Sequence, residues 1–301
     1  MTNKTSILSG RRTKSLVERI MNIIFLVCGL ASVVSVVFMT VYMVVSGGAI
    51  IAETGVFRFL LGHVWNPGGS EFGILPMILS SVLATLGAVL IALPVGVLIA
   101  VFLAKLSPGK LATAMRAFID LLAGIPSVIY GLLGALLLVP AIFKLQAAAG
   151  LPNSGSLLAA IVILVIMILP TIISVSETAI RSVPKQYEEA ALALGSTRLQ
   201  AIFKVTVPAA KSGIVAGMVL GTGRAIGEAM AVMMVSGNAA IMPELLRPVR
   251  LLTAAIPIEW AYSSGLHRQA LYGIGLVLFV FIMVINLLLR QVMKKGGAQD
   301  E

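Results

Sequence analysis

Two charged residues lie within an otherwise apolar stretch of this 301-residue chain. Arg224 and Glu228 are four residues apart in the segment 212–236, so they would share one face of a continuous helix. A charge near the centre of a lipid bilayer costs about 2.5–3.5 kcal/mol on insertion scales. Both side chains must therefore face protein or water rather than lipid.

This pair permits two interpretations. It is either an ion pair that satisfies itself within one helix and only fixes packing, or an element of a pathway for a solute. Intramembrane charges are functional by default, which favours the pathway. The guanidinium of Arg224 offers a fork of donors that suits an oxyanion such as phosphate. Glu228 would then orient Arg224 or act as a gate that repels the anion.

Glycines at intervals of four surround the pair. They form two sets, Gly213, Gly217 and Gly221 in one and Gly223 and Gly227 in the other. Small residues at this spacing let helix backbones approach closely. For all five we predict tight helix packing rather than contact with a substrate.

The sequence offers no catalytic constellation. His63 and His267 lie far apart in the chain, which argues against a metal site, and Cys28 is the single cysteine. The nucleotide-binding pattern G-x-x-x-x-G-K-[ST] does not occur, so ATP hydrolysis would have to come from another chain. We predict a non-catalytic membrane subunit with no cofactor of its own.

The elements that position these residues are apolar helices. Hydrophobic residues make up 59% of the chain and charged residues 11%, with a mean hydropathy of +1.05. Soluble domains hold about 25% charged residues. Backbone groups in lipid must be paired within a helix or a closed barrel, and long continuous apolar runs favour helices. We predict an all-α membrane protein with six transmembrane helices, at residues 20–46, 74–104, 120–143, 157–178, 212–236 and 267–290.

Prolines affect two of these spans. The second span is longer than a bilayer requires, so it must tilt, kink at Pro94 or project from the membrane. In the third span, Pro126 interrupts the helical hydrogen bonds, and Ser127 can bond the freed carbonyls. A helix that lines a cavity and a simple kink fit this pattern equally well.

Charge bias predicts the orientation. The two termini and the loops 104–119 and 179–211 together hold sixteen Lys and Arg, and the loops of the opposite side hold five. Cytoplasmic loops carry such an excess, so both termini are expected in the cytoplasm. The net charge of +10 thus reflects membrane topology rather than nucleic-acid binding.

The loop 179–211 is too long and too patterned for a simple connector. Pro184 can begin a helix, Gly195 suits the left-handed residue that ends one, and Ser196 or Thr197 can cap a second helix. The two helices would carry apolar faces made of Tyr187, Ala190, Ala191 and Leu194, and of Leu199, Ile202 and Phe203. These faces either dock on a soluble partner or pack on the spans of this chain.

Part of this loop resembles the EAA motif of bacterial ABC importer permeases. The resemblance rests on Glu189-Ala190-Ala191, then Gly195, then, after nine residues, Val205-Thr206-Val207-Pro208. The family pattern ends in Ile-x-Leu-Pro, and this chain has Val at both aliphatic positions. The resemblance implies a coupling helix that rests on an ATP-hydrolysing partner. Its coupling residues would be Glu189, Ala190, Ala191, Gly195 and Pro208.

The stretch Arg224-Ala225-Ile226-Gly227-Glu228 is similar to phosphate-importer permeases, whose members often continue with Thr where this chain has Ala229. Other stretches resemble the C-type permease of the phosphate system: Trp65-Asn66-Pro67, Phe72-Gly73-Ile74-Leu75-Pro76 and Gly124-Ile125-Pro126-Ser127-Val128-Ile129-Tyr130-Gly131. This likeness implies the type I ABC importer permease fold and a channel-forming subunit of an ATP-driven phosphate importer.

The same likeness implies the setting. Expected partners are a second, A-type permease, two copies of an ATPase that bind the ATP, an extracytoplasmic phosphate-binding protein, and the lipid of the bacterial inner membrane. Alternatives are the same fold with another oxyanion or solute, or an ion-coupled transporter without a motor. The expected division of the chain is a cytoplasmic tail (1–19), a first helix with its outer loop (20–73), a permease domain (74–290) and a cytoplasmic tail (291–301).

Overall fold

The computed structural model describes the backbone of residues 4–297 and the side chains of residues 16–288 and 291. The outermost parts of the two expected tails, residues 1–3 and 298–301, lie outside the described residues. Five of the described helices are long and apolar enough to cross a membrane, and a bent pair, Arg198–Ala209 with Lys211–Ile226, makes a sixth span if counted as one. The prediction of an all-α protein with six spans is therefore confirmed. The division into tails and a permease domain stays a prediction.

The elements follow one another in a simple order. The α-helices are α1 (Lys4–Thr54), α2 (Val56–Leu61), α3 (Leu75–Val101), α4 (Gly109–Gly124), α5 (Ser127–Leu133), α6 (Val139–Ala148), α7 (Leu157–Ser182), α8 (Lys185–Ala193), α9 (Arg198–Ala201), α10 (Val207–Ala209), α11 (Lys211–Ile226), α12 (Met230–Val235), α13 (Leu252–Glu259) and α14 (Gly265–Gly297). Three π-helical segments, η2 (Phe102–Leu106), η3 (Gly134–Leu138) and η4 (Ile202–Thr206), extend neighbouring helices. Strands β1 (Trp65–Asn66) and β2 (Glu71–Phe72) form a small antiparallel hairpin around the 3-10 turn η1 (Pro67–Gly69).

Helix α7 lies at the centre of the bundle, packed against α3 and α11. A Cβ added at Gly221 of α11 would lie 2.8 Å from Ile172 Cγ1 of α7, and one at Gly213 would lie 2.3 Å from Ala179 Cβ. Side chains at these positions would push the helices apart. The predicted tight packing is thus confirmed for Gly213, Gly217 and Gly221, whereas an added Cβ at Gly223 would meet open space.

The second span runs unbroken through Pro94, and η2 continues it to Leu106. Its 32 residues correspond to about 48 Å at 1.5 Å per residue, against a hydrocarbon core of about 30 Å. The helix is therefore not broken at Pro94, and tilt and projection beyond the bilayer stay predictions.

The predicted bounds of the third span, 120–143, are wrong. The chain leaves the helix at Ile125, whose φ of −70° and ψ of 128° are extended, and the apolar span is Ser127–Ala148. The cause is Pro126, which lacks an N–H and disfavours helical geometry in the residue before it. The Tyr130 hydroxyl, rather than Ser127, bonds a freed carbonyl, that of Leu122, at 2.7 Å.

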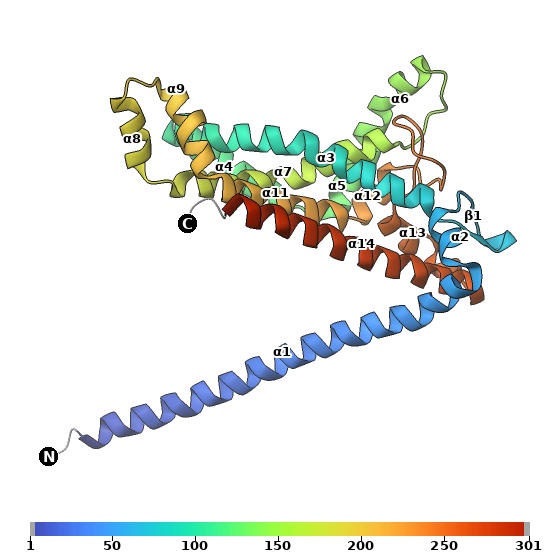
Figure 1. The fold of residues 1–301 in the computed structure, drawn as a ribbon, viewed down its shortest axis with the longest axis horizontal. Helices are drawn as coiled ribbons and strands as arrows, with labels where there is room; N and C mark the ends of the chain where they lie inside the picture. The colour runs from blue at the N-terminus through green and yellow to red at the C-terminus, as the bar shows by residue number, and fades with distance from the viewer. Residues whose placement is uncertain (1–3, 298–301) are drawn as a thin grey trace.

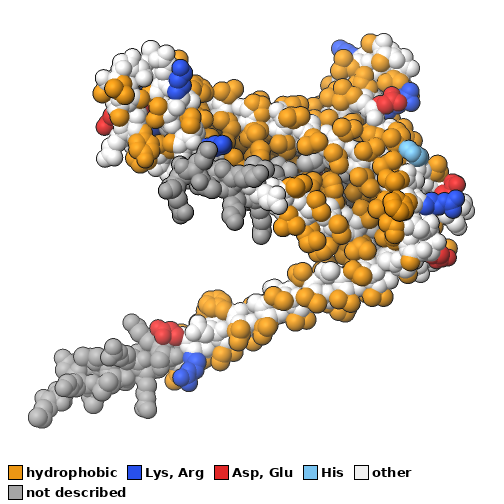
Figure 2. Space-filling model, in the orientation of Figure 1, with side chains coloured by type: hydrophobic (Ala, Val, Ile, Leu, Met, Phe, Trp, Pro, Cys, Tyr) orange, Lys and Arg blue, Asp and Glu red, His pale blue; other side chains and the backbone are white. Residues whose placement is uncertain are grey.

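The two ends of the bundle differ (Figure 1). Helices α8 and α9 lie at one end, while α2, the hairpin and α13 lie at the other. The long helix α1 contacts α14 near the hairpin end and then diverges from the bundle. Figure 2 shows hydrophobic side chains covering the middle of the molecule, with the charged side chains gathered toward the ends. This is the surface that a bilayer-spanning bundle requires.

Candidate functional site

The fifth span is interrupted where its charged residues lie. Helix α11 ends at Ile226, residues 227–229 are not helical, and α12 begins at Met230. The predicted continuous helix over 212–236 is therefore wrong, and Arg224 and Glu228 do not share a helix face. The glycines of this segment weaken the helix, and the Thr253 hydroxyl of α13 donates to the Glu228 carbonyl at 2.8 Å. That bond satisfies a backbone group that the break exposes.

The two charged side chains bind different partners. Glu228 Oε1 accepts a hydrogen bond from the Ala231 amide at 2.9 Å, so its carboxylate caps the start of α12. Arg224 Nη1 donates to Thr171 Oγ1 of α7 at 3.3 Å. Among the described side chains no ion pair joins Arg224 to Glu228. The interpretation as a self-contained ion pair in one helix does not describe this arrangement.

Two interrupted spans meet beside this site. Helix α5, which follows the break at Pro126, packs on α12, which follows the break at residues 227–229. A Cβ added at Gly131 would lie 2.8 Å from the Ala231 Cα, so the two helices touch at the backbone. Broken helices at membrane depth are tolerated where they are buried in protein or line a cavity. The partly exposed guanidinium of Arg224 thus lies next to backbone suited to a pathway.

The loop 179–211 forms the predicted helix, glycine turn and helix. Gly195 has a φ of +86° between α8 and α9. Thr197 caps α9 in a capping box with Gln200. Of the two predicted caps, Ser196 and Thr197, the structure therefore uses Thr197. Pro208 lies in α10, next to the bend of 67° that separates this region from α11.

The apolar residues of this loop divide between two environments. Ala191, Ala201 and Ile202 are buried, and Ile202 packs in an apolar cluster with residues of α3 and α7. Tyr187, Leu194, Leu199 and Phe203 are exposed, with Leu194 at 89%. Of the predicted coupling residues, Glu189, Ala190, Gly195 and Pro208 are exposed and Ala191 is buried. Packing on this chain is thus confirmed for part of the loop, and docking of the exposed side chains on a soluble partner stays a prediction.

At the hairpin end of the bundle, the Glu259 carboxylate binds several side chains. It was not identified from the sequence as a site residue. Glu259 accepts from Trp65 Nε1 at 3.1 and 3.0 Å on its two oxygens, and lies 2.7 Å from His267 Nε2. Arg250 also donates to it. This one side chain joins the hairpin, α13 and α14. A lone acidic residue in the apolar stretch 251–261 was the available signal.

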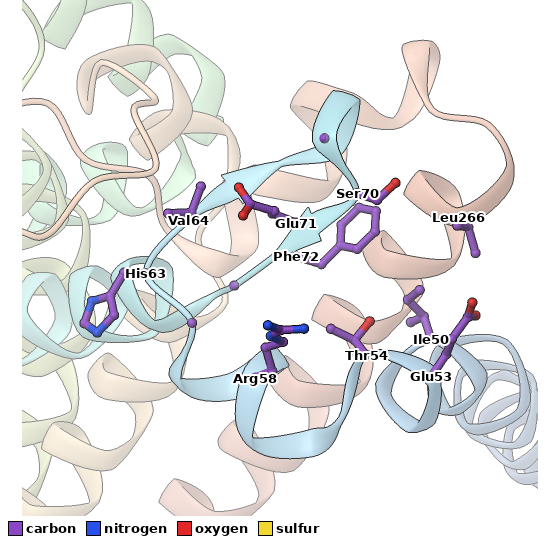
Figure 3. A pocket seen from close by; sticks show the side chains of 13 residues that line it. Ile50, Glu53, Thr54, Arg58, His63, Val64, Ser70, Glu71, Phe72 and Leu266 are labelled. Atoms are coloured by element: carbon purple, nitrogen blue, oxygen red, sulfur yellow. The ribbon is translucent and has the colours of Figure 1, made fainter.

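A polar pocket of about 530 Å³ also lies at that end, between α1, α2 and the hairpin (Figure 3). Glu53 and Glu71 line it together with Arg58 and His63. Two carboxylates face one guanidinium there, so the pocket offers no excess positive charge for an oxyanion. Among the residues that the structure describes, no group of three or more His, Cys, Asp and Glu is placed to hold a metal ion.

Comparison with known proteins agrees with this geometry. Residues 92–295 match the family described as the binding-protein-dependent transport system inner membrane component. The probable ABC transporter permease protein YqgH of Bacillus subtilis is 37% identical over 94% of this chain and 93% of its own. The phosphate transport system permease protein PstC of Pasteurella multocida is 36% identical over 80% of this chain and 82% of its own. PstC of Xylella fastidiosa is 35% identical over 83% and 84%.

Solved structures share the fold. The inward-facing methionine ABC transporter MetNI matches with a TM-score of 0.58 at 20% identity, over 77% of this chain and 99% of its own. A bacterial alginate ABC transporter matches with a TM-score of 0.63 at 14% identity, over 95% and 96%. The fold is that of type I ABC importer permeases. The chain belongs to the family of binding-protein-dependent transport system inner membrane components.

Proposed function

We propose that this chain is one of the two permease subunits of an ATP-driven phosphate importer. The observation that carries the proposal is its likeness to phosphate transport system permease proteins, at 36% and 35% identity over 80% and 83% of this chain. The position of Arg224 supports it, because an arginine with a hydroxyl partner and, among the described side chains, no carboxylate partner keeps donors for an oxyanion.

The partners follow from the same proposal. A second, A-type permease completes the pathway, two ATPase copies bind and hydrolyse the ATP, and an extracytoplasmic phosphate-binding protein delivers the anion. The chain itself carries out no chemical reaction. Charge bias supports an orientation with both termini and the loop 179–211 in the cytoplasm, and with the hairpin and Glu259 outside.

The mechanism is alternating access. The loaded binding protein docks on the outer loops, and ATP draws the two ATPase copies together beneath α8 and α9. Their movement rocks the spans, and the anion passes Arg224. Binding at Arg224 must be weak, since conduction requires that an anion leave as readily as it enters.

Phosphate uptake by reconstituted vesicles tests the proposal. Vesicles that hold this chain, the A-type permease and the ATPase are supplied with phosphate-loaded binding protein outside and ATP inside. We expect labelled phosphate to accumulate, and omission of this chain or of ATP to abolish uptake. A hundredfold excess of sulfate should leave uptake unchanged. Uptake of sulfate instead of phosphate would keep the fold and overturn the substrate, and uptake without the ATPase would overturn the ATP-driven mechanism.

A further inference from the structure

The cytoplasmic end of α3 leaves carbonyls that its own helix cannot bond. We name residues 102–108 the α3 junction. Within it, the Ser107 amide donates to the Phe102 carbonyl at 2.7 Å, which is the i to i−5 spacing of a π-helix. The next bond of that ladder would join residue 108 to Leu103, but residue 108 is a proline and has no N–H. The Leu103 carbonyl therefore needs another donor.

Arginines from two other helices supply it. Arg116 of α4 donates to the Leu103 carbonyl at 3.3 Å, and Arg181 of α7 donates to it at 3.0 Å. The Glu177 carboxylate, with a side chain 8% exposed, accepts from both guanidinium groups at 2.7 and 2.8 Å. Cations at the carbonyl end of a helix are favourable because that end carries partial negative charge. The junction thus fixes the middle of α4 and the end of α7 to α3.

The coupling loop binds the same junction. Arg198 of α9 donates to the Lys105 carbonyl at 3.0 Å. The Lys105 ammonium pairs with Glu188 of α8 at 2.8 Å, and the two side chains are only 15% and 18% exposed. The neighbouring Glu189 is exposed. Glu188 is thus the acidic residue that pairs with the α3 junction, while Glu189 lines the pocket beside this pair.

We infer that the α3 junction joins α8 to α3, α4 and α7, so that these elements move as one body when the motor moves the loop. This inference rests on the proposed function, because it presumes an ATPase beneath α8. The chain itself already connects α8 to α7 and α9 to α11. The junction adds a second connection through the ion pair of Lys105 and Glu188. It joins the loop to α3 and α4, which are not its neighbours in the sequence. Lys105 and Glu188 are positioning residues that do not contact the substrate.

Charge reversal and exchange test the connection. In the vesicles described above, Lys105→Glu and Glu188→Lys alone should each lower the phosphate imported per ATP hydrolysed by about tenfold, since coupled ionic partners interact strongly. The double variant K105E/E188K restores an opposite-charge pair and should recover most of that ratio. Lys110→Gln, which removes an exposed lysine of nearby α4, is the matched control and should behave as wild type.

A distance measurement gives a readout that does not depend on the substrate. In a Cys28→Ser background, spin labels at exposed Gln186 of α8 and Thr113 of α4 report the separation of the two helices. Adding ATP to the assembled complex should leave this distance unchanged in wild type and in K105E/E188K, and should change it in Glu188→Lys.

Each outcome decides between the two proposals. Wild-type coupling in either single variant, or an assembled double variant that stays uncoupled, would overturn the role of the junction. So would an ATP-dependent change of the label distance in wild type. If wild-type vesicles take up no phosphate, the proposed function fails, and the label distances still decide whether the junction moves as one body.

Discussion

Arg224 and Glu228 show how a break in a helix reassigns two charged side chains. On a continuous helix they would neutralise each other four residues apart. Because the chain leaves the helix after Ile226, Glu228 caps α12 instead and Arg224 binds the Thr171 hydroxyl. A neutral hydroxyl does not cancel the positive charge. The guanidinium therefore remains able to attract an anion through charge-assisted hydrogen bonds.

Replacement of Arg224 tests this role. Arg224→Gln keeps a donor for Thr171 but removes the charge. A hydrogen bond to a charged group contributes about 1.5–3 kcal/mol, which corresponds to a roughly ten- to hundredfold loss of phosphate uptake. Arg224→Lys keeps the charge without the fork of donors and should lose less. The measurement is initial uptake in vesicles, normalised to the amount of assembled complex.

Arg19→Gln serves as the control for that substitution, because Arg19 is exposed and lies on α1 rather than on the fifth span. It should leave uptake unchanged. If Arg224→Gln imports phosphate at the wild-type rate, the substrate-pathway role is wrong, and Arg224 serves only to hold α11 against α7 through Thr171.

At the scale of the elements, the α8–α9 unit depends on one backbone conformation. Gly195 has a φ of +86°, and an added Cβ would meet no atom within 4 Å. Gly195→Val should therefore act through the backbone alone, at a cost of about 1–2 kcal/mol for the left-handed conformation. A turn displaced in this way would present α8 wrongly to the ATPase. We expect ATP hydrolysis to continue while phosphate uptake falls.

Gly195→Asn is the matched variant, because Asn tolerates the left-handed region better than other residues. It should retain coupled uptake. Membrane fractionation and co-purification with the ATPase check that both variants assemble. If Gly195→Val couples ATP hydrolysis to phosphate uptake as the wild type does, this turn does not position the coupling helix.

Sequence patterns predicted the helices better than their interruptions. The apolar runs identify the spans because, in lipid, the backbone can form hydrogen bonds only with itself. Gly195 and Thr197 identify the turn between α8 and α9 because few residue types suit those two positions. The glycines near residues 227–229 weaken the helix but do not fix where it breaks, and a bond from Thr253, distant in sequence, satisfies the exposed carbonyl of Glu228. Glu259 stands out as a lone acidic residue, but its partners and those of the α3 junction lie on several elements, so the sequence does not identify them.

For the whole molecule, several charged residues that the sequence analysis used only to predict membrane orientation have specific binding partners in the structure. Arg116, Arg181 and Arg198 counted toward the cytoplasmic excess, and each donates to a carbonyl of the α3 junction. Glu259 gathers donors at the other end in a similar way. Each end of the bundle is thus held by a polar network beside an apolar cluster, and a third apolar cluster holds the middle. A middle with two broken spans suits a mechanism in which the spans rock.

The orientation of these two ends is open to direct measurement. Leu194, at 89% exposure, lies in the turn after α8, and Tyr262, at 86% exposure, lies between α13 and α14. The charge bias places the first in the cytoplasm and the second outside. In a Cys28→Ser background, a membrane-impermeant thiol reagent applied to intact cells should label Tyr262→Cys and spare Leu194→Cys. After the membrane is permeabilised, both should react, because both side chains are open to solvent. Labelling of Leu194→Cys in intact cells would reverse the orientation and separate α8 from any cytoplasmic ATPase.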